Sequence, residues 1–452
     1  MITTGISEDL RQTILEIVHE VGRRLADPDY VKAMCSSDSN RTDLQVDYKW
    51  DEISLASGYP AVSLLYGRLG AVFREETFTR YAHRYLVNTR EALKLKENIS
   101  LSLWSGLSGI GFTAYALSDN LRKYRSFIEQ INHLILRYGV TLLESSRNNL
   151  KTGVIFHDYN VISGWSGVGR YLLLFKDTPE MEDLLRDALE YLVMLSEERT
   201  WRGEVLPGWY IPAHKLPPHE QLRYPEGYFN MGLAHGIPSP LALLSIAWHQ
   251  NVRVSGHKEA IERFSLWLVD WKQKNDFGWY WPNNISYKDY MNGIISDETE
   301  REAWCYGSPE VARSLWLAGR ALENEDLKAL AVDAFKSIYT RPRKRWSIYS
   351  PTLCHGYSGL IKLTHQMYLD TGDAEFHDYA QDLLLEVVSM FDRGAAFGYW
   401  DIVKDTQSVK HLDFVGIGWG CRHCYDFTRF SRVRGKCLGK ELINHIAEGS
   451  KT

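Results

Sequence analysis

The stretch Ser350-Pro351-Thr352-Leu353-Cys354-His355-Gly356-Tyr357-Ser358-Gly359-Leu360 places a thiol and an imidazole side by side at a glycine turn. A similar turn lies upstream, Ala303-Trp304-Cys305-Tyr306-Gly307-Ser308-Pro309. Two cysteines and one histidine are three soft ligands, the number that a catalytic zinc site uses while keeping a fourth position open. We therefore expect the two turns to meet in space and to hold one zinc ion through Cys305, Cys354 and His355.

Four more glycine turns precede these two, and an apolar helical run follows each of them. The leading glycines of the six turns are Gly58, Gly106, Gly164, Gly236, Gly307 and Gly356. Glycine permits positive φ and lets the start of a helix approach its neighbours closely. The regular recurrence of these turns predicts a repeated helical hairpin with variable loops.

Between the turns, apolar residues recur three and four positions apart, which indicates helices. The helical stretches are 81–95, 126–143, 181–195, 260–271, 327–338 and 380–391. Each repeat thus predicts a pair of helices, and such a unit cannot bury its apolar face alone. The chain is expected to be all-α, a single domain over 1–452, with the turns gathered at one end of the inner helices.

Composition excludes several function classes. The 452 residues carry a formal charge of -5, which gives no reason to expect the basic surface that binds nucleic acid. No run of eighteen apolar residues occurs, so we expect no transmembrane segment. The N-terminus has acids where a signal peptide has bases and reads as an amphipathic helix with Ser7 as its N-cap. The six cysteines are expected to be thiols or ligands.

Two stretches interrupt the helical pattern. Residues 198–229 and 275–301 are rich in Trp, Tyr, Pro and Gly, which predicts irregular structure with short strands. They are either long loops or a small added lobe that grips a peptide. Both stretches lie next to turns that carry candidate site residues.

The turns around Gly236, Gly307 and Gly356 resemble the signatures of the lanthionine synthetase C-like family. Within it, the chain is most similar to the stand-alone cyclases of class I lantibiotic pathways, up to about residue 418. The resemblance implies an α/α toroid, a double ring of seven helical hairpins with a zinc site at one end. It implies that residues 198–229 belong to an inserted lobe that binds the leader peptide.

The resemblance also implies an activity. A cysteine thiol of a dehydrated precursor peptide adds to dehydroalanine or dehydrobutyrine, giving a lanthionine or methyllanthionine ring. Zinc makes the thiol available as thiolate, which is the nucleophilic form. The family match gives His235 a catalytic acid/base role and Arg301 a role in orienting the site or stabilising the enolate oxygen.

Several residues depart from the family pattern. Asn160 stands where the class I pattern has an aspartate, and an amide does not favour the imidazolium form of His235. Asp158 is a conceivable substitute, since in an extended segment it would share a face with Asn160. Glu302 stands where an aspartate is usual. Glu310 replaces a glycine, and we expect it to be solvated at a helix start, where an acid is favoured.

The tail departs most from the pattern. A seventh turn begins before residue 419, and the basic, poorly periodic run 419–452 follows, so the last repeat is expected to be degenerate.

Two other readings stay open. One is a catalytically impaired family member that binds precursor peptide and scaffolds the biosynthetic complex; Asn160 and the tail favour it. The intact Cys305, Cys354, His355 and His235 favour the enzyme. An unrelated toroid such as a glycosidase would need two facing carboxylates.

The resemblance also implies partners. They are the dehydrated precursor, leader plus core, and a lantibiotic dehydratase and an ABC exporter. The expected location is cytoplasmic, peripheral at the membrane through that complex.

Overall fold

The computed structural model describes residues 7–40, 50–296, 301–404 and 409–412. The chain divides into two compact units, residues 1–134 with 349–452 and residues 135–348. The positions of these parts relative to one another are not determined. The predicted atypical tail, 419–452, lies outside the described residues, and the single-domain prediction stays a prediction.

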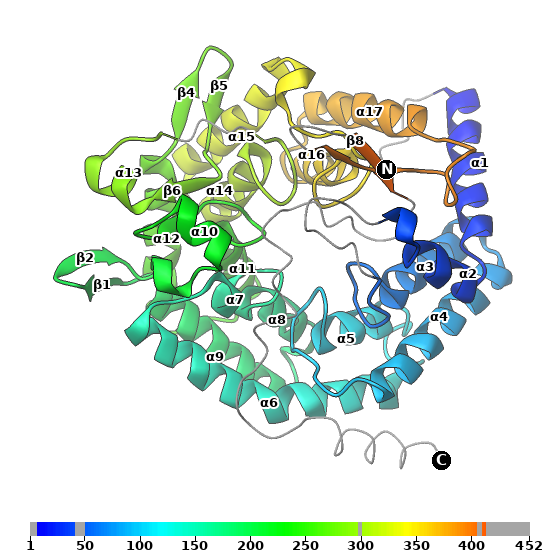
Figure 1. Cartoon of the computed structure of the whole chain (residues 1–452), viewed down its shortest axis with the longest axis horizontal. Coiled ribbons are helices and arrows are strands. Elements are labelled where there is room, and N and C mark those ends of the chain that lie inside the picture. The colour runs from blue at the N-terminus through cyan, green and yellow to red at the C-terminus, as the bar shows by residue number, and fades with distance from the viewer. Residues whose placement is uncertain (1–6, 41–49, 297–300, 405–408, 413–452) are drawn as a thin grey trace. The chain divides into compact units, whose positions relative to one another are not determined.

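The first unit is built mainly from helices (Figure 1). Its helices are α1 (Glu8–Arg24), α2 (Pro28–Cys35), η1 (Asp38–Asn40), α3 (Tyr59–Phe73), α4 (Glu76–Lys94), α5 (Leu107–Ala116), α16 (Tyr357–Thr371) and α17 (Ala374–Ser389). The strands β7 (Asp401–Lys404) and β8 (Val409–Leu412) pair antiparallel. The side chain of Ser7 accepts a hydrogen bond from the backbone N–H of Leu10, which confirms the predicted N-cap of α1.

The second unit is also mainly helical, and the long helix α6 (Arg125–Thr152) runs into it from the first. Its other helices are α7 (Phe156–Tyr159), α8 (Trp165–Leu172), η2 (Leu173–Phe175), α9 (Pro179–Leu195), η3 (Ala213–Lys215), α10 (Pro218–Arg223), α11 (Pro238–His249), α12 (His257–Asp270), α13 (Tyr287–Asn292), α14 (Ser308–Leu322), α15 (Glu325–Thr340) and η4 (Arg343–Arg345). All six predicted helical stretches fall on helices.

The glycine turns start the first helix of each hairpin. Gly58, Gly106, Gly164, Gly307 and Gly356 are the N-cap residues of α3, α5, α8, α14 and α16, and α11 begins two residues after Gly236. The first helix then packs against the second, as in α3 with α4, α8 with α9, α11 with α12, α14 with α15 and α16 with α17. In the second unit, α11 also packs against α8 and α14. The predicted helical-hairpin repeat is confirmed.

One backbone hydrogen bond repeats between successive turns. The N–H of Ala56, two residues before Gly58, donates to the carbonyl oxygen of Trp104 at 3.0 Å. In the second unit, Ala234 donates in the same way to Cys305 at 3.1 Å. The acceptor lies two residues before the next leading glycine in both cases. These two pairs of neighbouring turns are therefore joined in the same register, which helps to position the side chains that they carry.

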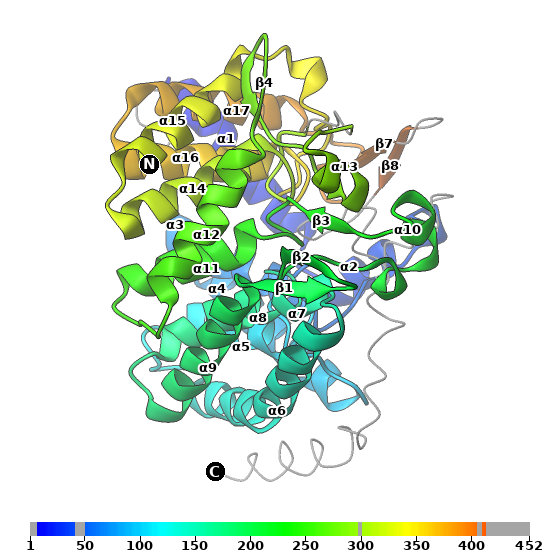
Figure 2. The same ribbon diagram turned by 90° about the vertical axis from the view of Figure 1, so that its left-hand side faces the viewer.

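Short strands occupy both stretches that interrupt the helical pattern. They form the hairpins β1 (Glu198–Trp201) with β2 (Glu204–Pro207) and β4 (Gln273–Asn275) with β5 (Gly278–Tyr280). Both hairpins extend away from the helices of the second unit in Figure 1, and Figure 2 shows β4 projecting beyond them in the turned view. The strand β3 (Tyr228–Asn230) pairs antiparallel with β6 (Asn284–Ser286). The two stretches are thus joined to each other, although their predicted role in binding a peptide stays a prediction.

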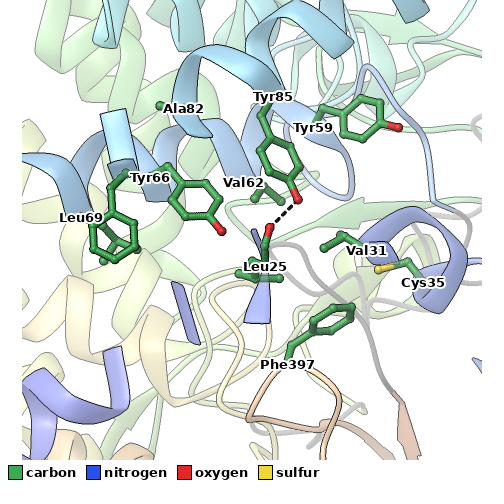
Figure 3. Close-up of a cluster of buried hydrophobic side chains, with 11 residues drawn as sticks. Leu25, Val31, Cys35, Tyr59, Val62, Tyr66, Leu69, Ala82, Tyr85 and Phe397 are labelled. Carbon is green, nitrogen blue, oxygen red and sulfur yellow. Dashed lines mark hydrogen bonds between the residues drawn. The ribbon is translucent and has the colours of Figure 1, made fainter. Parts of the chain in front are cut away.

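A cluster of buried aromatic and aliphatic side chains stabilises the first unit (Figure 3). Tyr66 of α3 and Tyr85 of α4 stack with ring centroids 5.7 Å apart. The hydroxyl of Tyr85 donates to the carbonyl oxygen of Leu25 at 2.7 Å, so its polar end is satisfied inside the cluster. Cys35 is fully buried in the same cluster, which makes it a packing residue. Among the described helices, none combines the length and apolar character that crossing a bilayer requires.

Candidate functional site

Three glycine turns of the second unit are hydrogen-bonded to one another. The hydroxyl of Ser239 accepts from the N–H of Val161 at 2.9 Å and donates to the carbonyl oxygen of Leu233. This serine therefore connects the turn around Gly164 to the turn before α11. The backbone hydrogen bond from Ala234 to Cys305 connects the turn before α11 to the turn before α14. The three turns are therefore linked by hydrogen bonds at the starts of α8, α11 and α14.

His235 and Asn160 meet at the first of these junctions. Both are fully buried, and the Nδ2 atom of Asn160 lies 2.9 Å from Nδ1 of His235. The Oδ1 atom of Asn160 accepts from the backbone N–H groups of Ser163 at 2.7 Å and Gly164 at 3.1 Å. The ring of Phe156 covers the imidazole with centroids 4.8 Å apart. Asn160 thus connects the start of α8 to the predicted catalytic histidine.

Asp158 is not a substitute for Asn160, because the segment is not extended. It lies in α7, where its carboxyl accepts from Asn149 Nδ2 at 3.0 and 3.1 Å and from the N–H of Ile155 at 3.0 Å. Burial raises the pKa of Asp158 to about 6, although these hydrogen bonds oppose the shift. Both carboxyl oxygens of Asp158 are therefore used in hydrogen bonds around α7. The residue that contacts His235 is Asn160.

The turn that carries Cys305 is tightly closed. Gly307 has φ +119°, and a Cβ there would lie 1.5 Å from the carbonyl oxygen of Arg301, so only glycine fits. Cys305 is fully buried, and the hydroxyl of Tyr306 accepts from Nδ2 of Asn230 at 3.0 Å. The half-buried Arg301 directly precedes this turn. The turn therefore holds Cys305 and Arg301 on one short closed loop.

Glu302 forms a buried ion pair beneath the same turn. Its carboxyl accepts from the guanidinium of Arg341, and neither side chain is exposed. The guanidinium also donates to Ser308 Oγ at 3.1 Å and to the carbonyl oxygen of Trp279. A buried pair with further hydrogen bonds can hold one backbone arrangement in place. The pair fixes the turn to the end of α15 and to β5.

Glu310 is fully buried in the first turn of α14, so the expectation that it is solvated is wrong. Burial raises its pKa well above 4.5, while the nearby backbone groups of Leu233 and Gly307 lower it. Neither carboxyl oxygen makes a hydrogen bond of good geometry within the described residues. Packing of α14 against α11 outweighs the usual preference of an acid at a helix start for water.

In the first unit, Cys354 and His355 lie at the turn before α16, and both are buried. The Nε2 atom of His355 lies 3.3 Å from Oδ1 of Asp401. That carboxylate oxygen also accepts from Ser350 Oγ at 2.8 Å. Burial alone would lower the pKa of His355, but the charge and hydrogen bond of Asp401, with a hydrogen bond to Cys354, raise it to about 9.

Sequence reasoning did not find Asp401. It follows His355 by 46 residues and belongs to β7, and no local motif marks it. It lines a cavity of about 320 Å³ next to the turn, together with apolar groups that include Pro351 and Trp400. Within the described residues, its Oδ2 atom is buried without a hydrogen bond. Asp401 is therefore the carboxylate that orients the predicted histidine ligand.

The predicted zinc ligands are divided between the units. Cys354 and His355 belong to the first unit and Cys305 to the second, and how the units sit relative to each other is not determined. No group of three or more His, Cys, Asp or Glu side chains is placed to hold a metal ion within the part of the chain that is described. The three-ligand site therefore stays a prediction, whereas the pairing of Asn160 with His235 is observed within one unit.

Comparison with known proteins adds three findings. A family model described as lanthionine synthetase C-like protein matches residues 49–417. The nisin biosynthesis protein NisC of Lactococcus lactis subsp. lactis is 25% identical over 394 residues, covering 78% of this chain and 89% of that protein. The solved structure of a nisin cyclase aligns with a TM-score of 0.70 at 22% identity, over 87% of this chain and 91% of that one. This structural likeness confirms the predicted α/α-toroid fold class.

Proposed function

The chain belongs to the lanthionine synthetase C-like family, and from this premise we propose that it is a zinc-dependent lanthipeptide cyclase. Its substrate would be a dehydrated precursor peptide. A peptide cysteine thiol would add to dehydroalanine or dehydrobutyrine, forming a lanthionine or methyllanthionine thioether ring. The name of its relative NisC, a nisin biosynthesis protein, supports this class of substrate.

The residues present fit a zinc site. Cys305, Cys354 and His355 supply two thiols and an imidazole, the soft donor set that zinc binds. The carboxylate of Asp401 lies 3.3 Å from Nε2 of His355, an arrangement that commonly orients a zinc-bound histidine, so His355 would be held in place as a ligand. Zinc, when bound, lowers the pKa of a coordinated thiol, so that thiolate is available near neutral pH.

Side chains of the second unit would act on the peptide. Addition of a thiolate to the alkene places negative charge on the neighbouring carbonyl oxygen, and fixed hydrogen-bond donors or cations stabilise such charge. His235 and Arg301 lie on neighbouring turns and are the residues proposed for this task. The buried pair of Glu302 and Arg341 would keep the Arg301 turn in position.

The observation that carries the proposal is the buried Cys354–His355–Asp401 arrangement in a chain of this family. The test is to incubate the purified, zinc-loaded chain with a dehydrated precursor peptide and to alkylate the remaining thiols before mass spectrometry. Cyclisation removes free thiols without changing the peptide mass. A peptide that binds but keeps all its thiols would favour the scaffold reading, in which the chain is catalytically impaired.

Three variants separate the proposed roles. Cys354→Ala should lose both zinc and cyclisation. His235→Ala should keep zinc but close rings slowly or in the wrong pattern. Cys35→Ala is the matched control, because Cys35 is a buried thiol within an apolar cluster, and this variant should keep both zinc and cyclisation. Full turnover by the His235 variant would refute the role of that residue.

The proposal extends to partners and place of action. A lantibiotic dehydratase would supply the dehydrated precursor, and an ABC exporter would remove the cyclised product. The chain would then work in the cytoplasm, at the membrane through that complex. Co-purification with each partner, with and without the precursor peptide, is the direct check.

A further inference from the structure

Asn160 is held in one orientation by its neighbours. Its Oδ1 atom accepts from the N–H of Ser163, the N–H of Gly164 and the hydroxyl of Ser163, at 2.7, 3.1 and 3.1 Å. If the amide were turned over, its NH2 group would face two backbone N–H donors, and these contacts would become repulsive. Nδ2 is therefore the atom that faces His235, at 2.9 Å.

This orientation decides which ring nitrogen of His235 carries the proton. An amide NH2 group can only donate, so Nδ1 of His235 must accept and cannot itself bear a hydrogen. We infer that Asn160 is a positioning residue that locks His235 as the neutral tautomer with its proton on Nε2. Adding a proton at Nδ1 would break a hydrogen bond between two fully buried side chains.

The tautomer limits what His235 can do in the cyclisation, and this consequence rests on the proposed function. As the sulfur–carbon bond forms, the alkene pair shifts toward the carbonyl group and charge gathers on its oxygen. A neutral imidazole with Nε2–H can donate a hydrogen bond to that oxygen, as neutral histidines do at other enolates. No proton leaves His235 in this step: the thiol has already lost its proton, and a proton from solvent reaches the α-carbon afterwards to complete the addition. His235 is therefore a hydrogen-bond donor here and does not act as a base.

Two other histidines of the same unit provide internal references. Nε2 of His257 lies 2.9 Å from the carbonyl oxygen of Leu244, which accepts only, so His257 also carries its proton on Nε2. Nδ1 of His157 lies 2.9 Å from Ser163 Oγ, whose hydrogen is given to Asn160, so His157 carries its proton on Nδ1. The unit thus contains one reference for each tautomer.

The test is ¹⁵N nuclear magnetic resonance of the full chain labelled at histidine, with the His235 signals assigned by their loss in His235→Gln. In the native chain, we expect His235 to show the pattern of His257, with hydrogen on Nε2. Asn160→Asp replaces the facing donor by an acceptor, and should move the hydrogen of His235 to Nδ1 while His257 stays unchanged.

The native spectrum alone decides the inference, even if the aspartate variant does not fold. A hydrogen on Nδ1 of His235 in the native chain would overturn it, as would an unchanged His235 pattern in a folded Asn160→Asp variant. Failure of the proposed cyclase function would give a different result. The nuclear magnetic resonance spectrum would still show hydrogen on Nε2 of His235, but the incubated peptide would keep all its thiols free.

Discussion

Glu310 offers a measurable test of how the second unit is packed. Its carboxyl is fully buried in α14, and burial raises its pKa above the ordinary glutamate value of 4.5. The folded chain therefore binds this proton more tightly than the unfolded chain does. The contribution of Glu310 to stability is therefore greatest below pH 4.5, where this group is protonated in both states, and that contribution falls as pH rises toward the folded pKa.

The size of this pH dependence is set by the binding of a single proton to Glu310. Within that pH window, Glu310 should make the free energy of unfolding fall by up to about 1.4 kcal/mol per pH unit. Glu310→Gln keeps the shape of the side chain and removes its ionisation, so its pH profile should lack this slope. The difference in unfolding free energy between the native chain and Glu310→Gln should therefore grow with pH, and that growth measures the cost of ionising Glu310 in the folded state.

Native-state hydrogen exchange at the amides of α14 is the appropriate assay, because it reports the opening free energy of this unit without requiring the whole chain to unfold in one step. Glu144→Gln, on the exposed side of α6, is the matched control and should follow the native profile. Parallel profiles for the native chain and Glu310→Gln across pH 5 to 8 would refute the reasoning.

Three further predictions concern the turns and the metal. Gly307→Ala should destabilise the second unit by more than the roughly 1–3 kcal/mol that a strained backbone costs, because a Cβ would also meet a backbone oxygen. The control is Gly293→Ala, since Gly293 also has a positive φ (+64°) but a Cβ there would meet no atom within 4 Å. Equal losses of unfolding free energy in the two variants would contradict the close approach at Gly307. Glu302→Ala should cost about 3–5 kcal/mol in unfolding experiments, because it leaves Arg341 buried and unpaired, and a loss under 1 kcal/mol would count against the pair. Chelation of zinc should stop cyclisation and its return should restore it, whereas undiminished cyclisation after complete removal would exclude the metal.

The repeat could be predicted from sequence because it depends on local chemistry. A glycine is required where a turn folds back on itself, and Gly307 illustrates this, since a Cβ there would overlap a backbone oxygen. Apolar spacing then marked the helix pairs that follow each turn. The likeness to a solved nisin cyclase confirms the fold class that these patterns and the family resemblance indicated.

Other features depend on contacts that local patterns do not encode. Asp401 reaches His355 from a strand far along the chain, and no spacing rule links them. The burial of Glu310 follows from the packing of α14 against α11, which a preference for acids at helix starts cannot anticipate. Asp158 could have replaced Asn160 only in an extended segment, but a single helical turn, α7, directs its carboxyl to Asn149 instead.

Zinc-edge X-ray absorption of the purified chain, combined with metal stoichiometry, tests most directly whether Cys305 shares a metal ion with Cys354 and His355. The expected result is one zinc ion per chain with two sulfur ligands and one imidazole nitrogen from the protein. Cys305→Ala should reduce the protein sulfur count to one. A chain without zinc, or a zinc ion whose sulfur count is unchanged in Cys305→Ala, would contradict zinc binding by these three residues.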